Sequence, residues 1–372
     1  MLIKESEMIE MLDNSENVLL IEPKYQKKYP PLGLAKIKTY LEEKNKKVKF
    51  SDQILPEKFD LICVTTLFTY YSKAVFDVLK NRGFFNSNTK ILIGGVLASI
   101  MPDIFKEEKN VFVFKGYSKI LDQCIPDPDI MNNTEDPWNT FSYIFTSRGC
   151  PNKCAYCTVW RIEKDRWVNP SWKEMIDLSK PNIMISDNNL SAVSMEHLKE
   201  IIDFTVENKK KILFDNGFDC KHITEDMAKE LSRLKFIRSG MRLAFDRIEE
   251  DGIFQKAVMM LKNAGIPKSS MMAYVLFNFT DHPQDAYYRA RSCYDLGIRP
   301  YPQYYRPLNT LDKKKIFIGK HWTLKLGRTF RHYWLMRGIH SKMSFEEYIN
   351  SKDGKEKHGI KMEDIKTYRR KK

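Results

Sequence analysis

Three cysteines that fall within eight residues carry the clearest chemical signal in this chain of 372 residues. Cys150, Cys154 and Cys157 follow the spacing C-x3-C-x2-C, and soft thiolates select zinc, Cu(I) or iron–sulfur clusters. A structural zinc site normally closes with four ligands, whereas the next cysteine is Cys220 and the first histidine is His197. Three ligands and one open position therefore suit a [4Fe–4S] cluster. A fortuitous grouping or an incomplete zinc site is the alternative.

Two series of apolar runs alternate with helical stretches and would position this loop. In the first series, strands are expected at residues 18–21, 47–50, 61–64 and 91–93, with helices at 34–41 and 74–79. In the second series, strands are expected at residues 143–146, 183–185, 212–214, 241–245, 272–277 and 301–305. Strands that alternate with helices imply parallel sheets.

The predicted fold class is α/β, with an N-terminal Rossmann-like parallel-sheet domain, a partial (βα)6 TIM-like barrel and a C-terminal helical extension. Prolines and asparagines gather at residues 124–139, which is typical of a linker. The expected domains are 1–130, a linker at 131–141, a barrel at 142–308 and an extension at 309–372. The carboxyl ends of barrel strands carry the chemistry in such folds. That rule puts five residues on one rim: Cys150, Asp187, Asn216, Asp246 and Asn278.

The cysteine loop, set between a strand and a helix, resembles the signature of the radical SAM superfamily, over roughly residues 142–308. The resemblance implies that the three cysteines bind three irons of a [4Fe–4S] cluster and that S-adenosyl-L-methionine (SAM) chelates the fourth. It implies that one electron, from a donor such as a flavodoxin or ferredoxin, cleaves the sulfonium bond. The 5′-deoxyadenosyl radical then takes a hydrogen atom from a substrate that the motifs do not identify. The resemblance assigns no catalytic residue.

The same resemblance implies a set of SAM contacts. Tyr156 matches the aromatic position near the adenine, and the segment after the second strand takes the place of the motif for the methionyl amino group. Positions on later strands would reach the ribose or carboxylate. For the segment after the second strand, the alternative is an ordinary loop with a helix cap. For Arg242, the alternative is an ordinary salt bridge. The implied contacts are Tyr156, Ser186, Asp187, Asn188, Asn189, Asn216, Arg242, Asp246 and Asn278.

Residues 17–130 resemble the cobalamin-binding domain that precedes many radical SAM barrels. Such domains often supply a histidine below the cobalt, and this segment contains none. We therefore do not expect cobalamin, although binding without a histidine ligand is the alternative. A degenerate domain that packs against the barrel and shapes the substrate site is the favoured interpretation.

Excess positive charge gathers at the C-terminal end. The chain has 62 Lys and Arg against 48 Asp and Glu, and residues 307–372 hold 18 of the former and 7 of the latter. A basic arm for a phosphate-bearing substrate or nucleic acid is one interpretation. A solvated tail beyond a capping helix at 323–338 is the other. A rival function follows from the first: a non-catalytic zinc- or iron-binding protein that binds nucleic acid.

The apolar runs are too short for a membrane protein. The longest, around residues 91–101, is far below the roughly 20 residues that span a bilayer. Acidic residues stand near the start, where a signal peptide has a basic and then an apolar stretch. We expect a cytoplasmic protein without a membrane partner.

Overall fold

The structure is a computed structural model that describes residues 1–25, 30–82, 88–336 and 339–351. It has mixed α/β architecture with several parallel sheets. The chain forms two compact units. Unit 1 comprises Met1–Ile183 with Leu308–Lys315, and unit 2 comprises Met184–Pro307 with the residues from Ile316 onward. The domain limits expected from the sequence stay a prediction.

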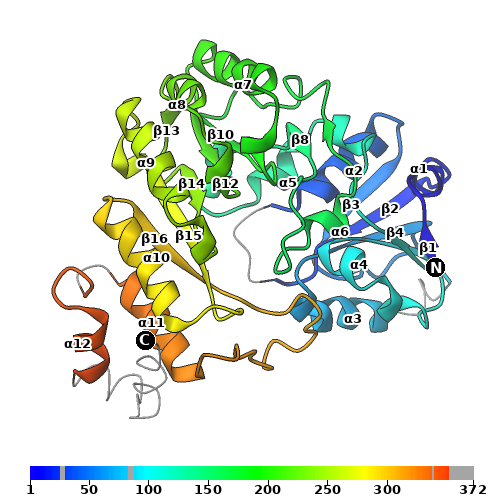
Figure 1. Ribbon diagram of the computed structural model, residues 1–372. Helices are drawn as coiled ribbons and strands as arrows, with labels where there is room; N and C mark the ends of the chain where they lie inside the picture. Colours follow the sequence, from blue (N-terminus) through cyan, green and yellow to red (C-terminus); the bar gives the residue numbers. More distant parts are fainter. Residues whose placement is uncertain (26–29, 83–87, 337–338, 352–372) are drawn as a thin grey trace. The chain divides into compact units, whose positions relative to one another are not determined.

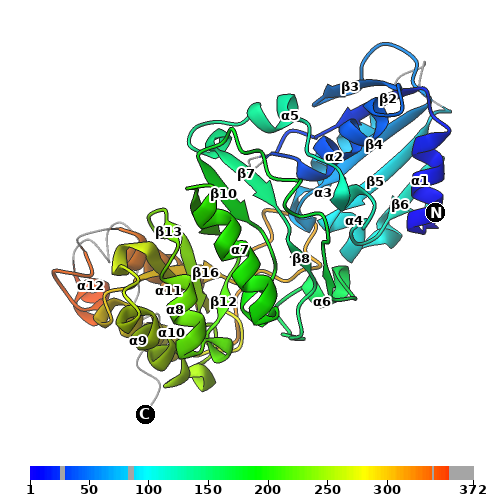
Figure 2. The same ribbon diagram turned by 90° about the horizontal axis from the view of Figure 1, so that it is seen from above.

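A six-stranded, all-parallel sheet dominates unit 1, and its strands run from blue to cyan in Figures 1 and 2. The strand order is β1-β6-β5-β4-β2-β3. The four strands predicted here are confirmed, whereas the edge strand β1 and its neighbour β6 were not predicted. The bounds are β1 Leu2–Ile3, β2 Asn17–Ile21, β3 Lys47–Ser51, β4 Leu61–Thr66, β5 Lys90–Gly95 and β6 Val111–Phe114.

Both faces of this sheet are covered. Val18, Leu19, Leu20 and Ile21 of β2 are all inaccessible to solvent although successive side chains point to opposite faces. This continuous apolar pattern is typical of parallel strands buried between helices. The helices are α1 Glu5–Asp13, α2 Leu32–Glu42, α3 Ser72–Lys80, α4 Val96–Ile100 and α5 Pro128–Asn132.

A tight turn at a Gly-Gly pair ends β5. Gly95 has φ +102°, and a Cβ there would lie 2.2 Å from the Thr66 carbonyl oxygen. The Thr66 hydroxyl donates to the Gly94 carbonyl at 2.8 Å and accepts from the Ala98 amide at 3.1 Å. Only glycine allows this close approach of β4 and β5 at their carboxyl ends.

The segment that carries the cysteines follows β7, Phe141–Ile144, in unit 1. Two short antiparallel strands, β8 Ser147–Arg148 and β9 Trp167–Val168, close a loop that contains the short helix α6, Val159–Ile162. The hairpin was not predicted, because two-residue strands show no periodicity.

Unit 2 continues the alternation of strands and helices. The first predicted strand of the second series is β7 of unit 1, and the other five correspond to β10, β11, β14, β15 and β16. β11 pairs in parallel with β13, and β12-β14-β15-β16 form a parallel sheet. The strands are β10 Asn182–Ile185, where the chain enters unit 2, β11 Lys211–Phe214, β12 Phe218–Asp219, β13 Lys235–Phe236, β14 Met241–Ala244, β15 Met271–Phe277 and β16 Arg299–Tyr304. The helices are α7 Met195–Glu207, α8 Glu225–Leu231, α9 Ile253–Asn263 and α10 Pro283–Asp295.

Three residues stand at helix ends of unit 2 in positions that suit their residue types. The Thr224 hydroxyl caps α8 by accepting from the Met227 amide at 3.2 Å. Gly265, at φ +96°, follows the end of α9, and Pro283 begins α10. A Gly just past a helix and a Pro at its start are the expected positions.

Two helices end the described chain, α11 Leu324–Leu335 and α12 Phe345–Asn350. Leu326, Phe330, Tyr333 and Trp334 of α11 form the predicted buried stripe. The predicted helix end at residues 337–338 and the basic residues 352–372 lie outside the described residues. Within the described ranges, no helix has the length and apolarity needed to cross a bilayer.

Candidate functional site

The cysteine loop, residues 149–166, begins with a glycine directly after β8. Arg148 stands opposite Trp167 in the β8–β9 pair, so the loop departs and returns at neighbouring points. Gly149 has φ +84°, and a Cβ there would lie 2.5 Å from the Asp165 carbonyl oxygen. Any other residue would be strained by the positive φ and would clash with backbone. Gly149 therefore fixes the peptide that precedes Cys150.

The three thiols fit the donor set of an iron–sulfur cluster. Cys150, Cys154 and Cys157 are half-buried and form no disulfide. The Cys150 sulfur accepts from the Asn152 amide at 3.4 Å, and the Cys157 sulfur accepts from the Val159 amide at 3.5 Å. Among the residues that the structure describes, no three His, Cys, Asp or Glu side chains are already gathered to hold a metal.

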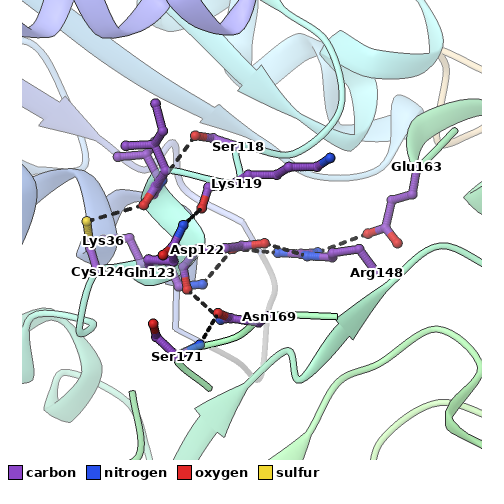
Figure 3. A network of polar contacts seen from close by, with 12 residues as sticks. Lys36, Ser118, Lys119, Asp122, Gln123, Cys124, Arg148, Glu163, Asn169 and Ser171 are labelled. Atoms are coloured by element: carbon purple, nitrogen blue, oxygen red, sulfur yellow. Dashed lines mark hydrogen bonds and ion pairs between the residues drawn. The ribbon is translucent and has the colours of Figure 1, made fainter. Parts of the chain in front are cut away.

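Four charged residues at the start of the loop form what we call the buried ion cluster: Lys36, Asp122, Arg148 and Glu163 (Figure 3). Arg148 makes a two-point contact with Asp122, in which Nε reaches Oδ2 at 2.7 Å and Nη2 reaches Oδ1 at 2.9 Å. Lys36 of α2 donates to the same carboxylate at 2.7 Å. The planar guanidinium fork matches both carboxylate oxygens, so the contact fixes the orientation of Arg148.

The chain of contacts continues from Arg148 into the loop (Figure 3). Arg148 Nη1 donates to Glu163 Oε1 at 2.9 Å, and Glu163 Oε2 accepts from the Gly149 amide at 2.6 Å. The guanidinium carbon also lies 3.4 Å from the centroid of the Phe145 ring and 5.2 Å from that of Tyr117. Arg148 is thus held on its edges by carboxylates and on its faces by aromatic rings.

The buried ion cluster has two cations, Lys36 and Arg148, and two carboxylates, Asp122 and Glu163, so its charges balance. Burial raises the pKa of the Asp122 carboxyl, but Arg148 and Lys36 outweigh that effect and the net pKa is lowered. Burial lowers the pKa of Lys36, and Asp122 offsets only part of that change. Asp122 therefore stays ionised and links the two cations.

Unit 2 brings Arg242 together with Asp215 and Tyr274. Arg242 forms an ion pair with the Asp215 carboxylate, and its Nη1 donates to the Asp215 carbonyl at 2.8 Å. The same nitrogen contacts the Tyr274 hydroxyl at 2.9 Å. Burial, with Asp215 nearby, raises the pKa of Tyr274 to about 12 although Arg242 acts the other way. The salt bridge considered for Arg242 from the sequence is therefore present.

The segment after β10 is joined to the end of β11 through Asn216. Its side-chain amide donates to the Ser186 carbonyl at 2.8 Å and to the Asp187 carbonyl at 3.3 Å. Asp187 and Asn189 are buried, whereas Ser186 and Asn188 are half-buried. Of the predicted contacts, these five residues are the ones that the fold places side by side.

The other predicted contacts have separate surroundings. Asp246 Oδ1 accepts from the Leu276 amide at 3.0 Å, which ties β14 to β15. Asn278 is fully buried, and its side chain donates to the Phe317 carbonyl at 3.2 Å and accepts from the Gly319 amide at 2.8 Å. Asn278 thus holds the segment that leads to α11. Tyr156 is half-buried within the cysteine loop.

Two buried cations were not predicted as site residues. Lys36 stands on the apolar face of α2. Arg289 stands on the buried face of α10 and donates through Nη1 to the carbonyls of Phe245, Asp246 and Leu276 at 2.8–2.9 Å. Both are charged residues within an apolar helical stripe. This pattern in the sequence could have predicted a buried polar contact, because a buried charge needs a partner.

The remaining four cysteines are packed residues, as predicted. Cys63, Cys124, Cys220 and Cys293 are all buried and form no disulfide. Burial raises the pKa of the Cys63, Cys220 and Cys293 thiols, which keeps them protonated and poor metal ligands.

Comparison with known proteins adds no assignment to these observations. No protein-family model matches the chain, and no curated protein matches it.

Proposed function

We propose that this protein is a radical SAM enzyme with a single [4Fe–4S] cluster on Cys150, Cys154 and Cys157. The observation that carries the proposal is the C-x3-C-x2-C loop itself, with three half-buried thiols and no fourth protein ligand nearby in the sequence. A site with one open iron suits a small-molecule ligand. When bound, the cluster would supply one electron to SAM, and SAM would supply the carbon-centred radical that abstracts hydrogen.

The residues of the chain would do four things around that chemistry. The cysteines would hold three irons, and Gly149 with Glu163 would fix the base of the loop. The carboxylate of Asp187 and the neighbouring amides could accept from the methionyl ammonium. Arg242, oriented by Asp215 and Tyr274, would contact the carboxylate or ribose of SAM.

The proposal includes a specific fold for each part of the chain. We infer a partial (βα)6 barrel from six strands that occur in order with a helix between each successive pair. The six-stranded parallel sheet supports a Rossmann-like front domain, and α11 with α12 supports a helical extension. We propose that the front domain takes no histidine-ligated cobalamin, because no histidine precedes His197.

The partners follow from the reaction. A one-electron carrier such as a flavodoxin or ferredoxin would supply the electron, which suits a cytoplasmic enzyme. The substrate is left open; the basic residues at 307–372 favour a phosphate-bearing molecule or a nucleic acid. Binding to a nucleic acid through this segment would weaken steeply with salt.

Anaerobic reconstitution tests the proposal. The protein is loaded with iron and sulfide, mixed with SAM and dithionite, and assayed for 5′-deoxyadenosine. The wild type and a Cys220→Ala control should form it, whereas Cys154→Ala should not. Equal product from Cys154→Ala would refute the proposal. About one zinc per chain with no iron absorbance would favour the rival nucleic-acid-binding protein.

A further inference from the structure

The buried ion cluster joins the cysteine loop to distant parts of the front segment. Lys36 lies on α2 and Asp122 on the short 3₁₀ turn Leu121–Gln123, whereas Arg148 is two residues before Cys150. The Lys36 and Asp122 side chains are 3% and 5% exposed, and Arg148 is 12% exposed. Because these side chains are largely inaccessible to solvent, water cannot replace a lost partner, and each side chain depends on its direct contacts.

Each contact in the cluster restricts the next one. Asp122 uses both carboxylate oxygens on Arg148, and Arg148 uses its remaining terminal nitrogen on Glu163. Glu163 uses its second oxygen on the Gly149 amide. The orientation of the peptide before Cys150 is therefore set, through three side chains, by residues of the front segment.

A second contact within unit 1 supports the same connection. Gly116 follows β6 with φ +103°, and a Cβ there would lie 3.0 Å from the Ile162 carbonyl oxygen of α6. The Gly116 amide donates to the Ser99 hydroxyl of α4 at 2.9 Å. Both ends of the cysteine loop therefore rest on the carboxyl-end loops of the front sheet.

We infer that Lys36 and Asp122 are positioning residues for the cysteine loop, so that the front segment is an integral part of the cluster-binding site. The inference rests on the proposed function for its cluster, but the positioning of the loop stands on the contacts alone. A buried ion cluster is often no more stabilising than apolar packing. Its distinctive contribution here is a fixed direction for Arg148, which an apolar replacement would not supply.

Alkylation of the thiols in the cluster-free full-length protein tests the positioning. Cys150, Cys154 and Cys157 are labelled with iodoacetamide under native conditions and quantified by mass spectrometry, with buried Cys63 and Cys293 as internal references. The variants are Asp122→Asn and the charge-balanced Lys36→Met/Asp122→Asn. The double variant removes one charge of each sign, so it should fold even where the single variant does not.

A neighbouring ion pair provides the matched control. Lys38 also lies on α2, and it contacts the buried carboxylate of Asp127 at 2.9 Å. The Asp127 carboxylate accepts from Lys38 and from the Ile130 amide, whereas Arg148 donates to Asp122 and Glu163. Lys38→Met and Asp127→Asn therefore disturb the same helix and the same downstream segment without touching the buried ion cluster.

The loop thiols should react about tenfold faster in the double variant, the factor for a local opening made about 1.4 kcal/mol easier. The reference thiols should keep their rate, and Asp122→Glu should restore most of the protection. Equal rates in the double variant and the wild type would overturn the inference. So would equal acceleration by the Asp127 and Asp122 variants, which would indicate general destabilisation.

A measurement on the loaded protein separates this inference from the proposed function. After reconstitution, the double variant should bind less iron or show a shifted EPR spectrum for the reduced cluster, and Asp127→Asn should not. A wild type that binds no iron would refute the proposed function while the alkylation result stands. A double variant with unchanged iron content and EPR spectrum would overturn the role in the cluster site.

Discussion

The Gly149 amide donates to Glu163 Oε2 at 2.6 Å, and this contact joins the first residue of the cysteine loop to a carboxylate fourteen positions later. The other oxygen of Glu163 neutralises Arg148. One buried side chain therefore closes the loop and completes the charge balance beneath it. Its removal should affect stability and cluster assembly together.

Glu163→Gln should lower the free energy of unfolding by about 3 kcal/mol, because it leaves the Arg148 charge without one of its two buried counterions. Urea denaturation of the cluster-free protein measures this. Glu174→Gln is the control at an exposed position close in sequence. Equal midpoints for the two variants would contradict the prediction.

Gly149→Ala should cost about 1–3 kcal/mol, the range for a residue forced into a sparsely populated backbone region. The added methyl would also meet the Asp165 carbonyl. Thermal denaturation and iron content after reconstitution should both fall. Gly33→Ala in α2, where a Cβ meets nothing within 4 Å, is the control and should leave both unchanged.

Asp122 should make stability sensitive to acid. Its pKa is lowered in the folded protein because Arg148 and Lys36 outweigh burial, so the unfolded state binds the proton first as the pH falls below about 4. The stabilisation from this carboxylate is therefore complete above that pH and is lost as the pH approaches the folded-state pKa. Asp122→Asn should flatten the decline in unfolding free energy below pH 4. A curve parallel to that of the wild type would show that Asp122 does not titrate in this way.

Arg289→Met should cost about 3–5 kcal/mol, because it removes the cation that pairs with the half-buried Asp281 carboxylate and leaves three strand-end carbonyls without this donor. Arg291→Met on the same helix removes an exposed pair with Asp295, worth less than about 0.5 kcal/mol. Chemical denaturation of both variants gives the comparison. Similar losses would show that Arg289 is not a structural tie between β14 and β15.

The sequence determines much of this protein locally. Apolar runs such as that of β2 predict buried parallel strands because each side chain on both faces is apolar. Thr224 marks a helix start through its capping hydroxyl, and Pro283 marks one through its fixed φ. Gly265 marks a helix end because the lack of a Cβ allows its positive φ. The cysteine spacing likewise predicts a thiolate loop, because three thiols within eight residues can reach one metal centre.

The tertiary structure decides which distant side chains meet. Nothing in the local pattern pairs Lys36 with Asp122, 86 residues away, or Arg242 with Asp215, 27 residues away. Asn278 ends a strand as predicted, yet its amide contacts residues 317–319, which its position in the sequence could not show. Such partners depend on long-range packing, since a buried polar group is satisfied by whatever donor or acceptor the fold brings to it.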